Sequence, residues 1–251
     1  MRFAGKVACV TGSSRGIGHR LAVRFAEEGA DVVVNYVRNG EAARKTAAEI
    51  EAAGRRALVV RANMADETKI KEMFNQIKTV FGRVDIFIHG AASGRNRSTM
   101  ELDTKGWDWT LSVNTRAFLI AVQQAVRLMP EEGGSVIALS SFGADYVFPY
   151  YASVGASKAA LESLVRYFAV ELAERKINVN AIAAGAVYTD ALKHFPEMEQ
   201  TIKHLKAKMP SGRMVNADDV ANLALFLCSK EAEMIRGQTI RVDGGVTLPL
   251  V

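Results

Sequence analysis

The stretch "KVACVTGSSRGIGHRLAVRFAEEG", from Lys6 to Gly29, joins a short apolar run to a glycine turn and then to an amphipathic pattern. The run "VACV" suits a buried strand. Apolar residues spaced three and four apart in "RLAVRFAEEG" predict a helix, and Gly29 lies where a helix C-cap favours glycine. A strand that turns through glycines into a helix is the first half of a βαβ unit. This stretch therefore predicts an α/β fold.

The same alternation of strand and helix continues along the chain. Runs rich in valine and isoleucine predict seven strands, at residues 6–12, 31–36, 57–62, 84–90, 134–141, 177–185 and 238–245. Their apolar character is typical of a parallel sheet covered on both faces, and the crossovers between them should be right-handed. We predict one domain over residues 1–251, a doubly wound Rossmann fold with a seven-stranded parallel sheet. Residues 189–214 interrupt the alternation and are expected to form a lid over a ligand.

Composition excludes several classes of protein. Hydrophobic residues make up 49% of the chain and charged residues 24%, which is typical of a soluble globular protein. No apolar run approaches the roughly 20 residues of a membrane span, and the first run is too short for a secretory signal. We therefore expect a cytoplasmic protein that does not insert in a membrane. Cys9 and Cys228 lie in apolar runs and are expected to be buried thiols, so no metal site or disulfide is predicted.

The net charge of +5 is spread along the whole chain instead of forming a stripe, so nucleic-acid binding is not predicted. An acidic partner or an anionic cofactor would explain the excess of basic residues. An ordinary solvated surface explains it equally well.

The glycine turn predicts a dinucleotide site. Gly12 permits the tight turn, Gly16 allows the backbone to approach a pyrophosphate, and Gly18 allows the helix to pack closely on the strand. The unpaired amides and the dipole of the helix favour an anion at this point. Other contacts with the cofactor are expected from the same turn, at Ser14, Arg15 and Ile17.

The end of the second strand bears on the choice of cofactor. In this fold an acidic residue about 20 positions after the glycines holds the ribose 2'-hydroxyl of NAD, and this chain has Asn35 there. Arg15 and Arg38 can pair with a 2'-phosphate, which a carboxylate would repel. The sequence therefore predicts NADPH over NADH, although either arginine can also be an ordinary solvated side chain.

Several motifs together resemble the short-chain dehydrogenase/reductases over essentially the whole chain. They are "TGSSRGIG", "VNTRA" around Asn114, "ALSS" at 138–141, the pair Tyr151 and Lys158, and "IRVDGG". Within that family, "AASG", "WDWT", "TDALKHFP", "GRM" and "MIRGQTIRVDGG" resemble the NADPH-dependent enoyl-acyl carrier protein reductases of the FabL type. The wide spacing of the tyrosine and the lysine adds to that resemblance. The resemblance implies reduction of trans-2-enoyl thioesters in fatty acid synthesis, a substrate carried on acyl carrier protein or CoA, and a homotetramer.

The resemblance also implies the roles of individual residues. It implies that Tyr151, Lys158, Ser141 and Asn114 are catalytic, with Lys158 on the nicotinamide ribose. Further cofactor contacts are expected at Asn63, Met64, Gly90, Gly185 and Thr189. His89 stands where the family often has an amide, and we interpret it as structural.

The spacing of tyrosine and lysine has a physical interpretation. The family tyrosine usually stands four residues before the lysine, where this chain has Val154, whereas Tyr151 stands seven before Lys158. In a helix, both offsets face the same side, but seven residues span about 10.5 Å and four span about 6 Å. Hydride transfer to a ketone needs an acid beside the receiving carbon. Reduction of an enoyl thioester places hydride on the β-carbon and charge on an oxygen several bonds away, and a displaced phenol suits that geometry.

Alternatives remain at each position. Tyr150 and Tyr146 compete with Tyr151, and Ser140 competes with Ser141, which can also simply cap a turn. Asn114 can hold a water near the lysine or be an ordinary helix asparagine. For the activity, the alternatives are an NADPH-dependent carbonyl or 3-oxoacyl thioester reductase, and a non-catalytic NADPH-binding regulator.

The expected lid is both apolar and basic. Its apolar residues at helical spacing would line an acyl slot or belong to the core, and they are Leu192, Phe195, Met198, Ile202 and Leu205. Its basic residues, with Arg95 and Arg97 elsewhere, would steer an acidic carrier protein or form a solvated face, and they are Lys193, Lys203, Lys206 and Lys208.

Overall fold

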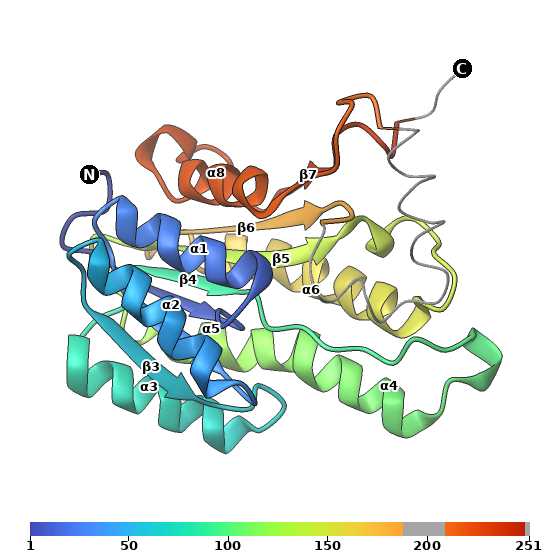
Figure 1. Cartoon of the computed structure of the whole chain (residues 1–251), viewed down its shortest axis with the longest axis horizontal. Coiled ribbons are helices and arrows are strands. Elements are labelled where there is room, and N and C mark those ends of the chain that lie inside the picture. Colours follow the sequence, from blue (N-terminus) through green and yellow to red (C-terminus); the bar gives the residue numbers. More distant parts are fainter. Residues whose placement is uncertain (188–208, 249–251) are drawn as a thin grey trace.

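The computed structural model describes residues 1–187 and 209–248, which form a parallel seven-stranded sheet covered by helices (Figure 1). The strands lie in the order β3-β2-β1-β4-β5-β6-β7. They are β1 (Val7–Thr11), β2 (Asp31–Tyr36), β3 (Ala57–Arg61), β4 (Ile86–His89), β5 (Gly134–Ser141), β6 (Ile177–Ala184) and β7 (Thr239–Val242). The predicted Rossmann fold and its seven strands are confirmed. The strand order reverses between β1 and β4, where a doubly wound sheet opens a crevice at the carboxyl ends of its strands.

Helices cover both faces of the sheet (Figure 1). One face carries α1 (Gly16–Glu27), α2 (Gly40–Ala52) and α8 (Ala217–Leu227). The other face carries α3 (Glu67–Phe81), α5 (Ala117–Val126) and α6 (Ala152–Glu171). A further helix, α4 (Thr104–Leu111), continues through a π-helical turn at Ser112–Arg116 directly into α5.

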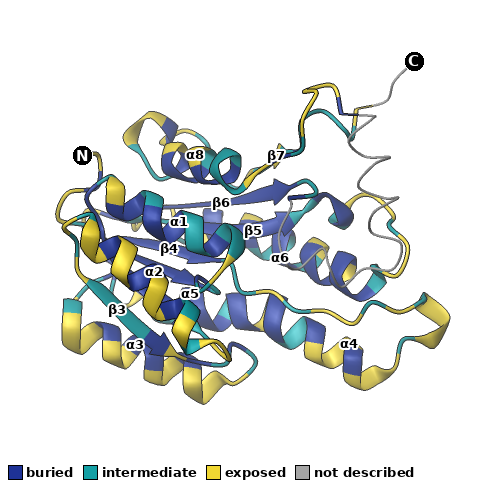
Figure 2. Cartoon of the chain, viewed as in Figure 1, coloured by how far each residue is buried: buried dark blue, intermediate teal, exposed yellow. Residues whose placement is uncertain are grey.

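Two apolar cores lie above and below the sheet, because successive strand residues point to opposite faces. Cys9 belongs to the core under α3, α5 and α6, whereas Val10 belongs to the core under α1, α2 and α8. Figure 2 shows the buried strands between helices whose outer surfaces are exposed. The near-continuous apolar runs of the sequence are therefore explained by burial on both faces.

The helix ends follow the glycines of the sequence. Gly29 and Gly54 come two residues after α1 and α2 and have positive φ angles of 100° and 75°. Glycine adopts this left-handed conformation without a Cβ penalty, so the chain can leave each helix and enter the next strand.

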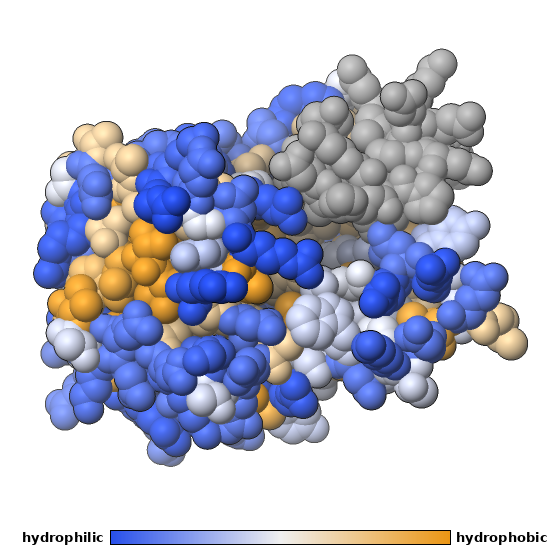
Figure 3. All heavy atoms as spheres, turned by 60° about the horizontal axis from the view of Figure 1, so that its bottom comes forward, coloured by the Kyte–Doolittle hydropathy of each residue, from blue (hydrophilic) through white to orange (hydrophobic). Residues whose placement is uncertain are grey.

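The surface shown in Figure 3 is mostly hydrophilic, with smaller groups of hydrophobic residues between. Across the described residues, no helix has both the length and the apolar character needed to cross a membrane.

Candidate active site

The turn between β1 and α1 is packed too closely for side chains at two of its glycines. Gly12 has a φ of 68°, and a Cβ atom there would lie 2.8 Å from Cα of Ala91. A Cβ atom at Gly18 would lie 2.4 Å from the carbonyl oxygen of Gly12. Both distances are shorter than van der Waals contact, so only glycine fits. The turn is therefore held tightly against both its own helix and the loop after β4.

The amino end of α1 presents backbone N–H groups without a capping side chain. Its N-cap residue, Arg15, makes no capping hydrogen bond, and the first turn has no acidic residue. In contrast, Asn39, Asp66 and Asp103 cap α2, α3 and α4 with their side chains. Uncapped amides at the positive end of the helix dipole are suited to an anion. The predicted contacts Ser14, Gly16 and Ile17 lie in this turn, half-buried.

Asn35 connects the glycine turn to the end of β3 through hydrogen bonds of its side chain. Its Oδ1 accepts a hydrogen bond of 3.1 Å from the N–H of Gly12, and its Nδ2 donates to the carbonyl of Ala62 at 3.1 Å. The side chain is fully buried. Asn35 therefore supports the glycine turn, and its expected contact with the cofactor stays a prediction.

Thr11 connects the ends of β1 and β4. Its hydroxyl oxygen accepts hydrogen bonds of 3.1 Å from the N–H groups of Gly90 and Ala91 and lies 3.3 Å from Nδ1 of His89. Burial, followed by the charge of Lys158, lowers the pKa of His89 to about 3. The imidazole is therefore neutral at physiological pH, which supports the structural interpretation of His89.

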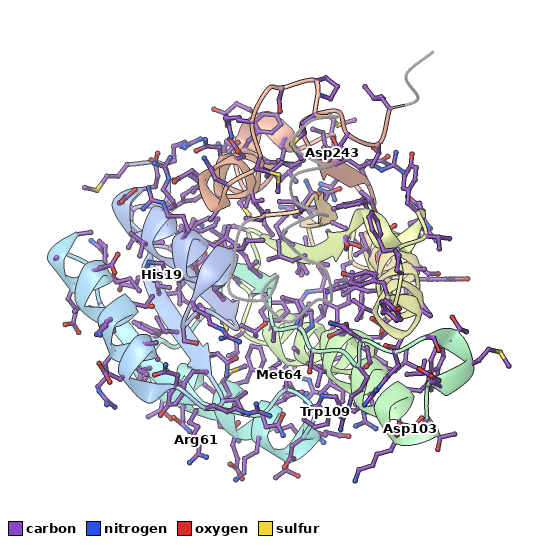
Figure 4. The ribbon with its side chains drawn as sticks, turned by 45° about the vertical axis from the view of Figure 1, so that its right-hand side comes forward. His19, Arg61, Met64, Asp103, Trp109 and Asp243 are labelled. Atoms are coloured by element: carbon purple, nitrogen blue, oxygen red, sulfur yellow. The ribbon has the colours of Figure 1, made fainter. Side chains whose placement is uncertain are left out.

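Two predicted cofactor residues, Asn63 and Met64, come just after β3 in the chain, and Figure 4 labels Met64. The Oδ1 of Asn63 accepts a hydrogen bond of 3.1 Å from the N–H of Ala65 and so shapes the turn before α3. Met64 is only 1% exposed. Its side chain belongs to the core, so any contact of Met64 with a ligand would have to come from its backbone.

Arg61 is a candidate site residue that sequence reasoning missed. It pairs in register with Tyr36, and its Nε donates a hydrogen bond of 3.2 Å to the carbonyl of Val37. This contact places Arg61 beside the segment that carries Arg38. Within residues 1–187 and 209–248, neither Arg15 nor Arg38 has an ion-pair partner. The sequence alone could not have singled out Arg61, because the register that brings it beside Tyr36 is seen only in the structure.

Tyr151 lies just before α6, as its N-cap residue, and not within the helix. Its hydroxyl donates a hydrogen bond of 3.2 Å to Oγ of Ser141, and that oxygen also accepts one of 3.2 Å from the N–H of Gly143. Burial raises the pKa of Tyr151, and the contact with Ser141 opposes this. The phenol is therefore a protonated hydrogen-bond donor at neutral pH. Because Tyr151 precedes the helix, the axial distance expected for an offset of seven does not apply to it.

Val154 occupies the position where the related enzymes usually have tyrosine. It is buried within the first turn of α6. A Cβ atom on Gly94 would lie 2.2 Å from Cγ2 of Val154, so the loop after β4 passes directly over this side chain. A larger side chain pointing the same way would displace that loop. Tyr151, three residues earlier in the chain, is the tyrosine that contacts Ser141.

Lys158 is buried on α6 and points at the sheet. Its Nζ donates a hydrogen bond of 2.7 Å to the carbonyl of Leu139 in β5. Burial lowers the pKa of Lys158 to about 8, and the nearby charge of Glu162 opposes this shift. At neutral pH the ammonium form still predominates, so a fixed positive charge lies beneath the carboxyl edge of the sheet.

The two adjacent serines of β5 are separated by the alternation of the strand. Ser140 is buried and its hydroxyl donates to the carboxyl group of Glu162, whereas Ser141 faces Tyr151. Burial raises the pKa of Glu162. The structure thus brings Ser141, and not Ser140, to the phenol.

Asn114 lies fully buried in the π-helical turn. Its Oδ1 accepts a hydrogen bond of 2.9 Å from the N–H of Ser93, and its Nδ2 donates to Oγ of Ser157 at 2.8 Å. Ser93 in turn accepts a hydrogen bond of 2.9 Å from Nε1 of Trp109. The Asn114 side chain therefore connects the loop after β4 to the residue preceding Lys158.

The competing tyrosines lie apart from Ser141. Tyr146 donates a hydrogen bond of 3.2 Å to the carbonyl of Thr247, and Tyr150 is 45% exposed with a φ of 62°. Since α6 begins at Ala152, neither belongs to the helix, and the angular comparison made from the sequence does not apply to them.

The remaining predicted residues lie near β6 and beyond. A Cβ atom at Gly185 would lie 2.9 Å from Cα of Asp243, so this glycine allows the ends of β6 and β7 to pack together. Asp243 and Trp109 flank the carboxyl edge of the sheet from opposite sides (Figure 4). Thr189 and most of the expected lid at 189–214 lie outside the described residues.

Comparison with known proteins decides the family. Residues 12–247 match the family model described as enoyl-(acyl carrier protein) reductase. The chain is 39% identical over 249 residues to the 1-cyclohexenylcarbonyl-CoA reductase of Streptomyces collinus, which covers 97% of this chain and 87% of that protein. The chain belongs to the short-chain dehydrogenase/reductase family. In this short-chain dehydrogenase/reductase the glycine turn follows β1, and the Tyr151–Ser141 contact lies at the start of α6.

Other relatives of this short-chain dehydrogenase/reductase have different activities in their names. It is 35% identical over 245 residues to the 3-oxoacyl-[acyl-carrier-protein] reductase FabG of Staphylococcus aureus, covering 96% of this chain and 98% of that protein. A short-chain dehydrogenase from Burkholderia cenocepacia, solved in complex with NADP, matches with a TM-score of 0.92 at 35% identity, covering 98% of this chain and 99% of that one. The protein is therefore an oxidoreductase of this family.

Proposed function

We propose that this protein uses NADPH to reduce the carbon–carbon double bond of trans-2-enoyl thioesters, as the FabL-type reductases that it resembles do. The observation that carries the proposal is the position of Tyr151. This tyrosine precedes α6, its hydroxyl contacts Ser141, and Val154 fills the usual tyrosine position beneath the loop at Gly94. The name of the Streptomyces collinus relative, a reductase of a cyclohexenylcarbonyl thioester, supports this substrate class.

The roles of the residues follow from their protonation and positions. Bound NADPH would supply a hydride for the β-carbon of the substrate. Negative charge then gathers on the thioester oxygen, where the protonated phenol of Tyr151 donates a hydrogen bond. Ser141 holds the phenol in place, and the buried ammonium of Lys158 orients the ribose and keeps the local potential positive. Asn114 positions Lys158 through Ser157, and the proton for the α-carbon comes from solvent.

The residues present fit a dinucleotide phosphate. The uncapped amino end of α1 would suit the pyrophosphate, and Gly90, Gly185 and the backbone of Met64 remain expected contacts elsewhere on the cofactor. Arg15, Arg38 and Arg61 are suited to the 2'-phosphate, because guanidinium groups pair with phosphate in a fork geometry and none of them faces an acidic residue at the end of β2. The Burkholderia cenocepacia structure with NADP agrees with this choice.

A second candidate is reduction of 3-oxoacyl thioesters. The similarity to the FabG protein favours it, and a phenol hydrogen-bonded to a serine can also protonate a carbonyl oxygen. In either case we propose that the acyl group arrives on an acidic carrier protein attracted by exposed arginines such as Arg95 and Arg97, and that the enzyme is a homotetramer.

A substrate panel distinguishes the two activities. Purified protein is given NADPH or NADH with a crotonyl or an acetoacetyl thioester, and loss of the cofactor's absorbance is followed. We expect oxidation of NADPH with the crotonyl substrate, and kcat falling roughly 100-fold or more in Tyr151→Phe, as for the loss of one oxyanion donor. Tyr150→Phe, at the exposed neighbouring phenol, is the matched control and should keep full activity. Turnover of the acetoacetyl substrate alone would establish the second candidate, and equal kcat/KM with NADH would overturn the choice of NADPH.

A further inference from the structure

The position of Tyr151 outside α6 raises the question of what holds its hydroxyl in place. A residue within the helix would be fixed relative to Lys158 by the helix backbone itself. Tyr151 instead depends on residues 142–150, which connect β5 to α6. This segment contains Tyr150 with a φ of 62°, a left-handed conformation that is unfavourable for a bulky residue. Strained residues of this kind persist only where the surrounding contacts determine them.

Within this segment, Asp145 and Tyr146 are held by residues at and just after the end of β7, about a hundred positions away in sequence. The guanidinium of Arg241 donates to Oδ2 of Asp145 at 2.5 Å and lies over the ring of Tyr146, 5.2 Å from its centroid. The hydroxyl of Tyr146 donates to the carbonyl of Thr247 at 3.2 Å. We call Arg241, Asp145, Tyr146 and Thr247 the β7 clamp.

Thr247, the last residue of the β7 clamp, is held in place by Asp243. Thr247 donates its hydroxyl to Oδ2 of Asp243 at 2.5 Å, and Oδ1 of Asp243 accepts from the N–H of Gly245 at 2.9 Å. Asp243 is buried and follows β7 directly. The clamp therefore connects residues 145–146 to the central sheet.

Aromatic rings connect the β7 clamp to the phenol of Tyr151. The ring of Phe148 packs edge-on against Phe142 at a centroid distance of 4.6 Å and against Tyr151 at 6.2 Å. A Cβ atom on Gly143 would lie 2.5 Å from the ring of Tyr151. Movement of residues 142–148 would therefore move the Tyr151 ring.

We infer that Arg241 is a positioning residue for Tyr151: through Asp145 and Tyr146 it holds the β5–α6 segment so that the phenol stays at Ser141. This inference rests on the proposed catalytic role of Tyr151. Arg241 and Asp145 are 41% and 51% exposed in their side chains, and exposed ion pairs contribute little to global stability. The clamp therefore acts on the placement of one segment more than on the folding of the protein.

A double-mutant cycle tests the coupling. Arg241→Met keeps the apolar stem and removes the charge, and Arg241→Lys restores the charge. We expect Arg241→Met to lower kcat with the crotonyl thioester roughly tenfold, since misplacement of a catalytic group by about 1 Å has effects of this order or larger. The NADPH dissociation constant and the midpoint of urea unfolding should change little, and Arg241→Lys should recover part of kcat.

The decisive variant combines Arg241→Met with Tyr151→Phe. If Arg241 acts through the phenol, the double variant should be no slower than Tyr151→Phe alone. Multiplied losses would overturn the inference. Arg2→Met is the matched control. Near the other end of the chain, Arg2 likewise pairs with the carboxylate of Glu28 and lies over the ring of Phe3. The kcat of Arg2→Met should equal that of the wild type.

A spectroscopic measurement separates this inference from the proposed function. The protein has six tyrosines, and 3-fluorotyrosine labelling gives each a ¹⁹F resonance, with that of Tyr151 assigned by its loss in Tyr151→Phe. Arg241→Met should shift or broaden the Tyr151 resonance, and Arg2→Met should leave it in place. A Tyr151 resonance that does not respond to Arg241→Met would overturn the inference. If Tyr151→Phe instead keeps full activity, the proposed function fails, and the ¹⁹F result alone decides the role of Arg241.

Discussion

Replacing Lys158 with methionine should make the protein more stable at neutral pH while removing its activity. Methionine matches the length of the lysine stem and suits the apolar surroundings of this buried position. The substitution removes the buried positive charge of the lysine and its hydrogen bond to the carbonyl of Leu139. Residues that serve a reaction are often unfavourable for folding in this way.

The magnitude follows from the pKa. Burial lowers the pKa of Lys158 from 10.5 to about 8, which corresponds to about 3 kcal/mol of destabilisation by the charged form. Below pH 8 the lysine is charged in both the folded and the unfolded chain, so the full penalty applies. Between pH 8 and 10.5 the folded chain loses its proton first, and the penalty falls as the pH rises. Above 10.5 both states are neutral and the penalty disappears.

The assay is urea unfolding of the cofactor-free protein at a series of pH values from 6 to 10, at one protein concentration. At pH 7 the free energy of unfolding of Lys158→Met should exceed that of the wild type by up to about 3 kcal/mol, less the contribution of the lost hydrogen bond. This excess should shrink as the pH approaches 10. Lys71→Met, at an exposed lysine of α3 paired with Glu67, should show a small difference that does not follow this course. An excess for Lys158→Met that stays constant over the range would refute the reasoning.

Two further predictions concern stability. Burial lowers the pKa of His89 from 6.5 to about 3, so the free energy of unfolding should fall as the pH drops below 6.5 and the unfolded chain takes up a proton. In urea unfolding at pH 4–7, His89→Asn should make this fall less steep. A fall of unchanged steepness would contradict the assignment. Gly18→Ala should destabilise the protein by about 1–3 kcal/mol because its Cβ would meet the carbonyl of Gly12, whereas helix propensity alone would favour alanine; a stabilised variant would show that the turn can relax.

The fold was predictable because its signal is repeated. Strands buried on both faces must be apolar at nearly every position, so β1, β2 and β6 stand out in the sequence. The π-helical turn at Ser112–Arg116 has no such signal, since it is a single wide turn that no residue type marks in the sequence. The start of α6 was also hidden, because no local pattern marks the left-handed backbone at Tyr150 that precedes it.

The sequence indicated which residue types form the candidate site, but it did not show which side chains contact one another. The alternation of side chains along β5 could have separated Ser140 from Ser141 beforehand, once the end of the strand was known. The same argument applied to β2 would have placed Asn35 inside the protein. Arg61 required the register between β2 and β3, which a single sequence does not contain.

The contact between Gly94 and Val154 has a consequence for how this enzyme can be altered. Grafting an aromatic residue onto position 154 would not by itself recreate the ordinary arrangement, since the backbone over Cγ2 leaves no room for a ring in that direction. Glycine is already the smallest residue, so no substitution at Gly94 makes room for the ring, and the loop backbone itself would have to move. A tyrosine introduced at position 154 should therefore need a shift of the loop after β4 as well.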